Sequence, residues 1–263
     1  MFNRKPMWVT PTSLRRSSKL QLSSGAHTVT GPRHVVNQDR FLIDHSRGVL
    51  IVADGMGGMR AGERASQMAV DLLPAHRDLA ERENLSDTRL MNAISDAFLD
   101  TNDEIVRTGQ ADSNLEGMGT TAVMALLHHS RLFIAGLGDS RAYLLREGHL
   151  RQYTIDHSMA QLLVNQGTIS PAEAKRHRWR HMLWQFLGYP QLKNGPQVCT
   201  ISLEAGDRLL LVTDGVTDVL SKAQLVAGLC RNDTAQGAAH ELVESAVRYG
   251  TRDDATCVAL YVD

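Results

Sequence analysis

Cysteine is scarce in this sequence. The 263 residues include only Cys199, Cys230 and Cys257, which are odd in number and widely spaced. A disulfide framework needs an even set of cysteines and a cysteine zinc site needs closely spaced pairs, so the sequence argues against both. We therefore predict a protein of a reducing compartment, the cytoplasm.

Long hydrophobic runs and an excess of charge of either sign are also missing. Apolar runs such as residues 132–137 and 209–212 are far shorter than the ~20 residues that cross a bilayer, so we predict no membrane insertion. The 28 Lys plus Arg nearly balance the 29 Asp plus Glu. This balance argues against binding to nucleic acid or anionic lipid by bulk charge.

The acidic residues are unevenly divided, with 19 Asp and only 10 Glu. Aspartate is a poor helix former but suits turns, caps and metal sites, so the excess suggests carboxylates at the ends of elements. No acidic residue precedes Asp39, which makes residues 1–19 a basic arm. The arm is either a flexible or partly ordered terminus or a docking segment for an acidic partner. We assign residues 20–263 to a single domain.

Short apolar runs rich in Val, Ile, Leu and Phe predict buried strands, and amphipathic segments between them predict helices. The expected strands are residues 49–53, 121–127, 132–137, 209–213 and 256–262. The expected helices are residues 61–79, 87–108, a short one after the Ser170-Pro171 start signal, 222–230 and 238–249. This order favours an α+β domain with helices packed over largely antiparallel sheets.

Aspartates follow or precede four of the apolar runs. Asp54-Gly55, Asp139 and Asp214-Gly215 come directly after strands, and Asp253-Asp254 comes just before the last one. One such junction is ordinary turn chemistry. If all four converge, however, the repulsion between their carboxylates must be relieved by cations or by raised pKa values. Oxygen ligands without a clear His or Cys partner select Mg²⁺ or Mn²⁺ rather than zinc.

The residues at these junctions are part of an ordered set of motifs that resembles a known family. The motifs are Asn37-Gln38-Asp39, Asp54-Gly55-Met56-Gly57-Gly58, Gly119-Thr120-Thr121, Gly138-Asp139-Ser140-Arg141, Asp156-His157-Ser158, Asp214-Gly215 and Asp253-Asp254-Ala255-Thr256. The set resembles the metal-dependent protein serine/threonine phosphatases of the PP2C (PPM) type, in their bacterial form. The resemblance implies a β-sandwich of two antiparallel sheets, flanked by antiparallel helix pairs, with a binuclear metal site at one edge.

The resemblance also implies metal ligands, position by position. Asp54 would bridge two Mn²⁺ or Mg²⁺ ions, the Gly55 carbonyl would complete one coordination sphere, and Asp214 and Asp254 would hold the first ion. Asp54, Asp214 and Asp254 would thus be the catalytic residues, acting through a metal-activated water. Three further carboxylates have supporting roles: Asp39 through water, Asp139 with Asp214 at a weaker third ion, and Asp218 as an assistant.

The activity that the resemblance implies is hydrolysis of phosphoserine and phosphothreonine by a metal-bridging water or hydroxide. The expected partners are phosphorylated proteins, including a partner serine/threonine kinase or its substrates, and we expect the chain to act as a monomer. A non-catalytic relative that binds phosphoproteins is the alternative from another class. A hydrolase of small phosphate esters is a third hypothesis.

The sequence departs from the family's pattern at two places. An arginine that grips the substrate phosphate is expected five residues before Asp39, where His34 stands, with Arg33 one place further away. Arg33 is the favoured phosphate ligand and His34 the alternative, since an imidazole has less charge and no bidentate fork. Met56 stands where many eukaryotic members have a histidine, so the general acid is not identified.

Residues 156–188 correspond to the family's flap, which lies beside the active-site cleft. This flap region contains the densest basic run of the chain, residues 175–181. His177 and His181 are four apart on an expected helix, but Arg178 replaces the glutamate of a zinc-protease pair. The run is therefore either a solvated helix face or a contact for an acidic or phosphorylated partner. We expect His128 and His129 to be exposed turn residues.

Overall fold

The structure is a computed structural model that describes residues 20–80 and 82–263, apart from the side chains of residues 59, 60 and 80. The predicted basic arm, residues 1–19, lies outside the described residues. The strands are β1 (Leu22–Val29), β2 (Asp39–Asp44), β3 (Val49–Met56), β4 (Gly119–Thr120), β5 (Ala122–His128), β6 (Arg131–Leu137), β7 (Arg141–Arg146), β8 (His149–Gln152), β9 (Cys199–Ser202), β10 (Arg208–Val212) and β11 (Ala255–Val262). The α-helices are α1 (Met59–Leu72), α2 (Arg77–Ala80), α3 (Asp87–Ala111), α4 (Met159–Asn165), α5 (Pro171–Ala174), α6 (Asp214–Thr217), α7 (Lys222–Arg231) and α8 (Ala235–Arg248).

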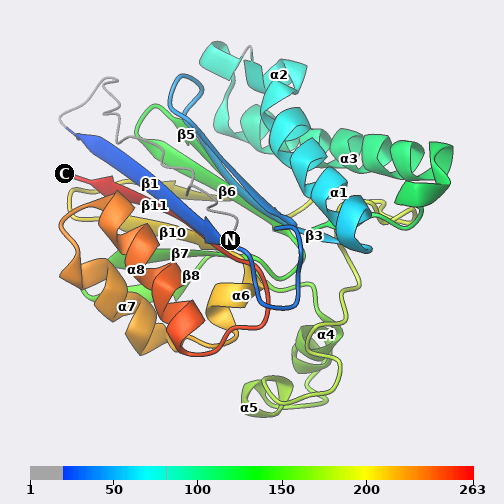
Figure 1. Cartoon of the computed structure of the whole chain (residues 1–263). Helices are drawn as coiled ribbons and strands as arrows, with labels where there is room; N and C mark the ends of the chain where they lie inside the picture. Colours follow the sequence, from blue (N-terminus) through cyan, green and yellow to red (C-terminus); the bar gives the residue numbers. More distant parts are fainter. Residues whose placement is uncertain (1–19, 81) are drawn as a thin grey trace.

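The strands form two antiparallel sheets that pack face to face (Figure 1). One sheet has the order β1-β11-β10-β7-β8, and the other has the order β2-β3-β5-β6-β9, with β4 paired to β3. The first and last strands of the described chain, β1 and β11, lie side by side over eight residue pairs. The predicted α+β sandwich is therefore confirmed.

Alternation along the strands produces the layers of the sandwich. In β3, Val49, Ile51 and Ala53 face the helices on the outside of their sheet, whereas Leu50 and Val52 face the opposite sheet. This period of two is what an extended chain buried on both faces requires. The same alternation in β11 places Val258 and Leu260 between the sheets and the intervening residues against helices.

A pair of helices covers the outer face of each sheet (Figure 1). Helices α1 and α3 pack on the sheet that contains β3, and α7 and α8 pack on the sheet that contains β10 and β11. The site described below lies at one edge of this four-layer arrangement, where β2, β3, β10 and β11 end or begin. The outer layers hold these strand ends in a fixed relative position.

Two of the expected helices differ from those in the structure. The helix expected over residues 61–79 ends as α1 at Leu72, and a 3-10 turn and the short α2 follow. Pro74 lies in that turn; a proline has no amide hydrogen and clashes with the preceding helical turn, so it interrupts the helix. The helix expected to end at residue 108 continues as α3 to Ala111.

The basic run is not helical, so the expectation of a charged helix face is wrong. Helix α5 begins with the predicted capping box of Ser170 and Glu173, but it ends at Ala174. Residues 175–181 then follow a series of tight turns. His177 and His181 consequently do not share a helix face.

One bridge closes the base of the flap region, and further contacts tie that region to the sandwich. Ser158 and Leu183 form an isolated bridge at the base of α4, and Thr120 and Leu187 form a second one beside β4. The side chain of Asn102 on α3 accepts hydrogen bonds from the amides of residues 188 and 189. The ends of the flap region are thus fixed to strands and to α3, while α4 and α5 extend away from the sandwich (Figure 1).

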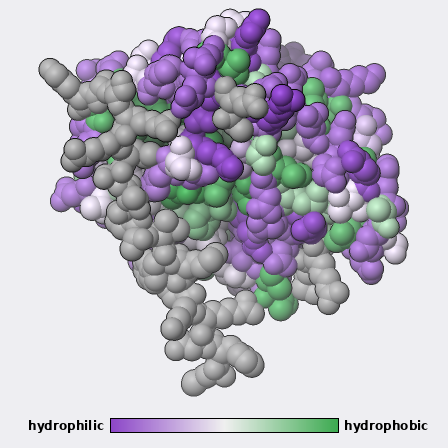
Figure 2. Space-filling model, turned by 90° about the horizontal axis from the view of Figure 1, so that it is seen from above, coloured by the Kyte–Doolittle hydropathy of each residue, from purple (hydrophilic) through white to green (hydrophobic). Residues whose placement is uncertain are grey.

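The surface has the mixed character that the composition predicts. The face shown in Figure 2 is largely hydrophilic, with hydrophobic residues in small groups. No helix in the described part of the chain is long and apolar enough to cross a membrane. The expectation for His128 is wrong: it is the last residue of β5 and 7% exposed, whereas His129 adopts a positive φ of 56° in the following turn.

Candidate metal centre and phosphatase active site

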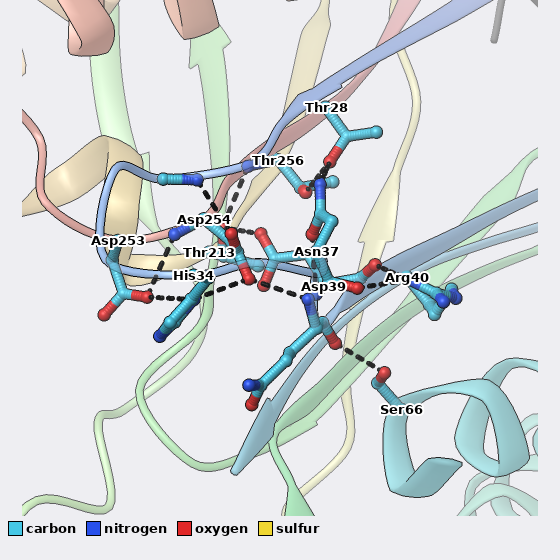
Figure 3. A network of polar contacts seen from close by, with 12 residues as sticks. Thr28, His34, Asn37, Asp39, Arg40, Ser66, Thr213, Asp253, Asp254 and Thr256 are labelled. Atoms are coloured by element: carbon cyan, nitrogen blue, oxygen red, sulfur yellow. Dashed lines mark hydrogen bonds and ion pairs between the residues drawn. The ribbon is translucent and has the colours of Figure 1, made fainter. Parts of the chain in front are cut away.

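The carboxylates predicted at the strand ends converge at one edge of the sandwich. Asp39 begins β2 and lies directly opposite Asp54 in the ladder between β2 and β3. Asp214 follows β10, and the pair Asp253-Asp254 precedes β11, which is hydrogen-bonded to β10. The antiparallel pairing therefore brings groups more than 200 residues apart in sequence to the same place, part of which is drawn in Figure 3.

Asp39 is deeply buried and has one carboxylate oxygen without a hydrogen-bond partner. Its residue is 2% exposed, its Oδ2 accepts a hydrogen bond from Thr213 Oγ1 at 2.9 Å, and its Oδ1 has no partner. Burial raises the pKa of Asp39 well above its usual value, and the charges of Asp254 and Asp214 add to the shift. Hydrogen bonds from threonines oppose it. A buried acceptor without a donor is a position where a cation is expected.

The backbone of Asp54 is fixed by the neighbouring β4 and β5 residues. Thr120 Oγ1 donates to the Asp54 carbonyl at 2.8 Å, and the Thr121 amide donates to the same carbonyl. Burial raises the pKa of the Asp54 carboxyl well above its usual value, and the charges of Asp39, Asp214 and Asp139 raise it further. Asp54 is thus the carboxylate whose pKa the charges of the other aspartates raise together.

Asp139 and Asp214 form the side of the site that is nearest to the flap region. Burial, followed by the charges of Asp214 and Asp156, raises the pKa of Asp139. Oδ1 of Asp214 is buried and has no hydrogen-bond partner. On the flap, His181 Nδ1 lies 3.6 Å from Asp214 Oδ2 and His181 Nε2 lies 3.4 Å from Asp218 Oδ2. Asp139, His181 and Asp214 each offer an atom that could hold a cation.

These observations fit divalent cations. The charges of four other carboxylates raise the pKa of Asp54, and two of these, Asp39 and Asp214, each have a buried oxygen without a donor. Protonation or cation binding would relieve this repulsion, and oxygen ligands favour Mg²⁺ or Mn²⁺. The donor set therefore fits the two predicted ions.

The carboxylates of Asp253 and Asp254 lie in different surroundings. The carboxylate of Asp254 is enclosed by donors: the Gly31 amide bonds Oδ1 at 2.8 Å, and the Gln38 amide bonds Oδ2 at 2.7 Å. The Asp253 side chain is 50% exposed, and the charge of Asp214 is the main addition to the effect of burial in raising its pKa. Asp253 also raises the pKa of Asp54. The geometry thus favours Asp253, which sequence reasoning missed, over Asp254 as the metal ligand.

His34, and not Arg33, lies against the carboxylates. His34 Nδ1 is 2.9 Å from Asp254 Oδ2 and 3.6 Å from Asp253 Oδ1, as Figure 3 shows, whereas the Arg33 residue is exposed. The favoured prediction of Arg33 as the phosphate ligand has no support in this arrangement. The five-residue spacing from Asp39 was the signal that pointed to His34.

Asp218 lies at the rim of the site. Its side chain is 42% exposed, and it faces His181 across 3.4 Å. Burial raises the pKa of Asp218 and Asp214 adds to the shift, whereas His181, Arg141 and Arg180 lower it. Its predicted role as an assistant to the metal ligands is consistent with this position.

A comparison with known protein families matches residues 30–245 to protein phosphatase 2C. The chain belongs to the PP2C family. The matched range includes β2, β3 and β10 and the carboxylates at their ends. It also contains the flap region.

Individual relatives agree with this assignment. The chain is 38% identical over 210 residues to the serine/threonine protein phosphatase PstP of Mycobacterium tuberculosis, which covers 80% of this chain but 39% of that protein. It is 35% identical over 209 residues to the serine/threonine phosphatase stp of Listeria innocua, covering 79% of this chain and 82% of the relative. The chain thus spans about two fifths of the first relative and most of the second.

A solved PP2C structure provides a comparison for the metals. The catalytic domain of PstP in complex with two manganese ions superimposes with a TM-score of 0.79 at 33% identity, covering 93% of this chain and 99% of that one. The predicted PP2C family is confirmed by these relatives. Family membership favours the catalytic prediction over the non-catalytic, phosphoprotein-binding alternative.

Metal binding to the PP2C site should stabilise the protein in a pH-dependent way. Asp39, Asp54 and Asp139 have raised pKa values when folded, so the metal-free protein loses stability as the pH rises through those values. Mn²⁺ replaces the protons. We expect saturating Mn²⁺ to raise the melting temperature by about 5–10 °C, and by more as the pH rises through those pKa values. Differential scanning fluorimetry over a series of pH values measures the shift, and a shift that does not change with pH would contradict this account.

Proposed function

We propose that this chain hydrolyses phosphoserine and phosphothreonine in proteins. The observation that carries the proposal is the convergence of carboxylates from β2, β3, β10 and β11, with two buried oxygens that lack a donor, in a chain of the PP2C family. When bound, two divalent cations acidify a water molecule and neutralise charge on the phosphoryl group. The chain's own residues hold and orient these ions and the substrate.

Each carboxylate has a proposed role. Asp54, with the Gly55 carbonyl beside it, would be shared by the two cations, and Asp214 and Asp253 would complete the site of the first one. Asp39 would act in the outer shell, where Thr213 and the ladder pairing with Asp54 fix its orientation. Asp139 and Asp214, assisted by Asp218, would hold a third, weaker cation.

Asp254 is proposed as a positioning residue. Its hydrogen bonds to the Gly31 and Gln38 amides hold the loop that carries His34 and leads into Asp39. Since the acceptor at 2.9 Å is a carboxylate, the Nδ1 of His34 carries the hydrogen of that contact. A phosphate oxygen accepts hydrogen bonds, so Nε2 binds it as a donor only in the imidazolium form, in which both ring nitrogens carry a hydrogen. We propose His34 rather than Arg33 as the phosphate ligand.

The cellular setting is also a proposal. Dephosphorylation of Ser and Thr would reverse the action of a partner serine/threonine kinase, on the kinase itself or on its substrates. Cys199, Cys230 and Cys257 are unpaired, which supports a reducing cytoplasm. We propose that residues 20–263 act as one monomeric catalytic domain.

Hydrolysis of a phosphothreonine peptide with and without metal tests this function. We expect turnover with Mn²⁺, loss of turnover after removal of metal with EDTA, and recovery when Mn²⁺ is restored, since all proposed ligands are oxygens. Released phosphate is the measurement. Turnover that persists after complete metal removal would overturn the metal-dependent mechanism, and binding of the peptide without turnover with any divalent cation would favour the non-catalytic alternative.

A further inference from the structure

The basic run of the flap region is an exposed, positively charged surface beside the active site. We name residues 175–181 the basic segment; it contains Lys175, Arg176, Arg178 and Arg180 as well as two histidines. All four cationic residues are exposed. The segment follows α5, in the part of the chain that extends from the sandwich in Figure 1.

Within the described residues, His181 at the end of the basic segment faces Asp214 and Asp218, whereas the Lys and Arg residues of the segment have no acidic partner. The flap region contains two acidic residues, and both have other partners. Glu173 Oε2 accepts hydrogen bonds from the amide and hydroxyl of Ser170, each at 2.7 Å. Asp156 binds the guanidinium of Arg141 through both oxygens. The charges of Lys175, Arg176, Arg178 and Arg180 form no ion pair with any acidic residue among the described residues.

The segment also forms one wall of a hollow. A cavity of about 880 Å³ is lined by Ile169, Ala172 and one acidic residue, Glu173, together with Lys175, Arg176, His177 and Arg178. The Arg178 guanidinium lies 4.8 Å from the centre of the Trp179 ring. Stacking of this kind orients a guanidinium and leaves its edge available to a carboxylate. The hollow thus combines cationic groups with apolar surface, as a peptide-binding site requires.

The end of the basic segment reaches the metal site. His181 lies 3.6 Å from Asp214 and 3.4 Å from Asp218. The Met159 amide donates to the Met182 carbonyl at 2.7 Å, which fixes this end of the segment to the base of the flap region. The position of the segment relative to the site is therefore determined by the fold.

The reach of the segment defines which part of a substrate it would meet. Arg178 is three residues from His181, so their Cα atoms are at most about 11 Å apart, and Arg176 at most about 18 Å. An extended peptide advances about 3.3 Å per residue. With the phosphate at the metal site, residues up to about five positions from the phosphorylated one would lie over the basic segment.

We propose that the basic segment is a binding subsite for aspartate and glutamate side chains that flank the phosphorylated residue of the substrate. The enzyme would then prefer phosphoproteins that are acidic within about five residues of the phosphorylation site. This proposal rests on the proposed phosphatase function. It concerns the selection of substrates by Lys175, Arg176 and Arg178, which hold neither the cations nor the phosphate.

The test compares four phosphothreonine peptides: one with aspartates on the N-terminal side, one with aspartates on the C-terminal side, one neutral and one with lysines. The variants are K175S/R176S/R178S, K175E/R176E/R178E and the control K222S/R231S/R248S, which removes the same charge from exposed residues of α7 and α8. kcat/KM is measured with Mn²⁺ for each peptide and for para-nitrophenyl phosphate. Binding of the same peptides is measured by fluorescence anisotropy in EDTA.

We expect one of the two acidic peptides to exceed the neutral peptide about tenfold in kcat/KM, mainly through a lower KM. The preference should shrink when salt rises from about 0.05 M to about 0.5 M. The serine variant should lose the preference, the glutamate variant should favour the lysine peptide, and the control should resemble the wild type. All three should hydrolyse para-nitrophenyl phosphate at the wild-type rate.

Two outcomes would overturn the inference alone: equal kcat/KM for acidic and neutral peptides in the wild type, or an acidic preference that survives in the serine variant. If the variants lose para-nitrophenyl phosphate hydrolysis in the same proportion, the segment supports the site and is not a subsite, which also overturns it. Absence of turnover on every substrate with an intact acidic preference in anisotropy would instead overturn the proposed function.

Discussion

Asp54→Asn is expected to reduce hydrolysis of a phosphothreonine peptide by more than about 100-fold. Replacing a residue that only supports a metal ligand lowers activity by about 10–100-fold, so the expected loss is larger. Asp54 is the carboxylate whose protonation responds to the charges of Asp39, Asp214 and Asp139 together. Asparagine keeps the size and one oxygen of the side chain but removes the negative charge. Two cations would then lose their shared counter-charge, and kcat with saturating Mn²⁺ is the measurement.

A control separates this effect from damage to the fold. Asp96→Asn changes an exposed residue of α3 in the same way and should leave kcat unchanged. The melting temperature of metal-free Asp54→Asn should be equal to or higher than that of the wild type, since the substitution removes a repelled charge. Activity of Asp54→Asn within a few-fold of the wild type would exclude Asp54 as the bridging ligand.

Asp253 and Asp254 should give opposite results when each is replaced by alanine. Asp253→Ala should lower activity by more than about 100-fold with little change in stability, because its side chain is half exposed and faces the other carboxylates. Asp254→Ala should destabilise the fold by about 2–5 kcal/mol, because the buried amides of Gly31 and Gln38 would lose their acceptors.

Urea denaturation of the metal-free variants and phosphate release with Mn²⁺ distinguish the two roles. Excess Mn²⁺ should partly restore the activity of Asp253→Ala if a weakened site is the cause. A destabilised Asp253→Ala together with a stable, inactive Asp254→Ala would reverse the assignment. In that case the metal ligand would be Asp254, as the sequence motif alone predicts.

The fold was predictable because its signals are local and repeated. Apolar runs with residues buried on both faces, such as those in β3 and β10, read as strands without knowledge of their partners. The ordered motifs then predicted the sheets and the site edge. Pro74 was visible in the sequence as a helix breaker, so the continuous helix over residues 61–79 was an avoidable error.

The site was less predictable where two adjacent residues compete for one role. Both side chains lie near His34, but amide donors enclose the carboxylate of Asp254 whereas the side chain of Asp253 is half exposed. The choice depends on the loop that carries Gly31 and His34, which lies more than 200 residues away in sequence. The contact of His181 with Asp214 was hidden for a similar reason, because the basic segment was expected to be helical and instead forms turns.

Because the base of the flap region is closed, the flap sequence can change during evolution without a change in the metal site. The bridge between Ser158 and Leu183 holds the ends of the intervening chain in place. The hydrogen bonds that the amides of residues 188 and 189 donate to Asn102 fix the C-terminal end further. Doubling the length of a flexible loop between fixed ends costs only about 0.6 kcal/mol. Insertions, deletions and charge changes between these ends therefore need not displace the strands that carry the aspartates, so target choice can diverge while the chemistry stays the same.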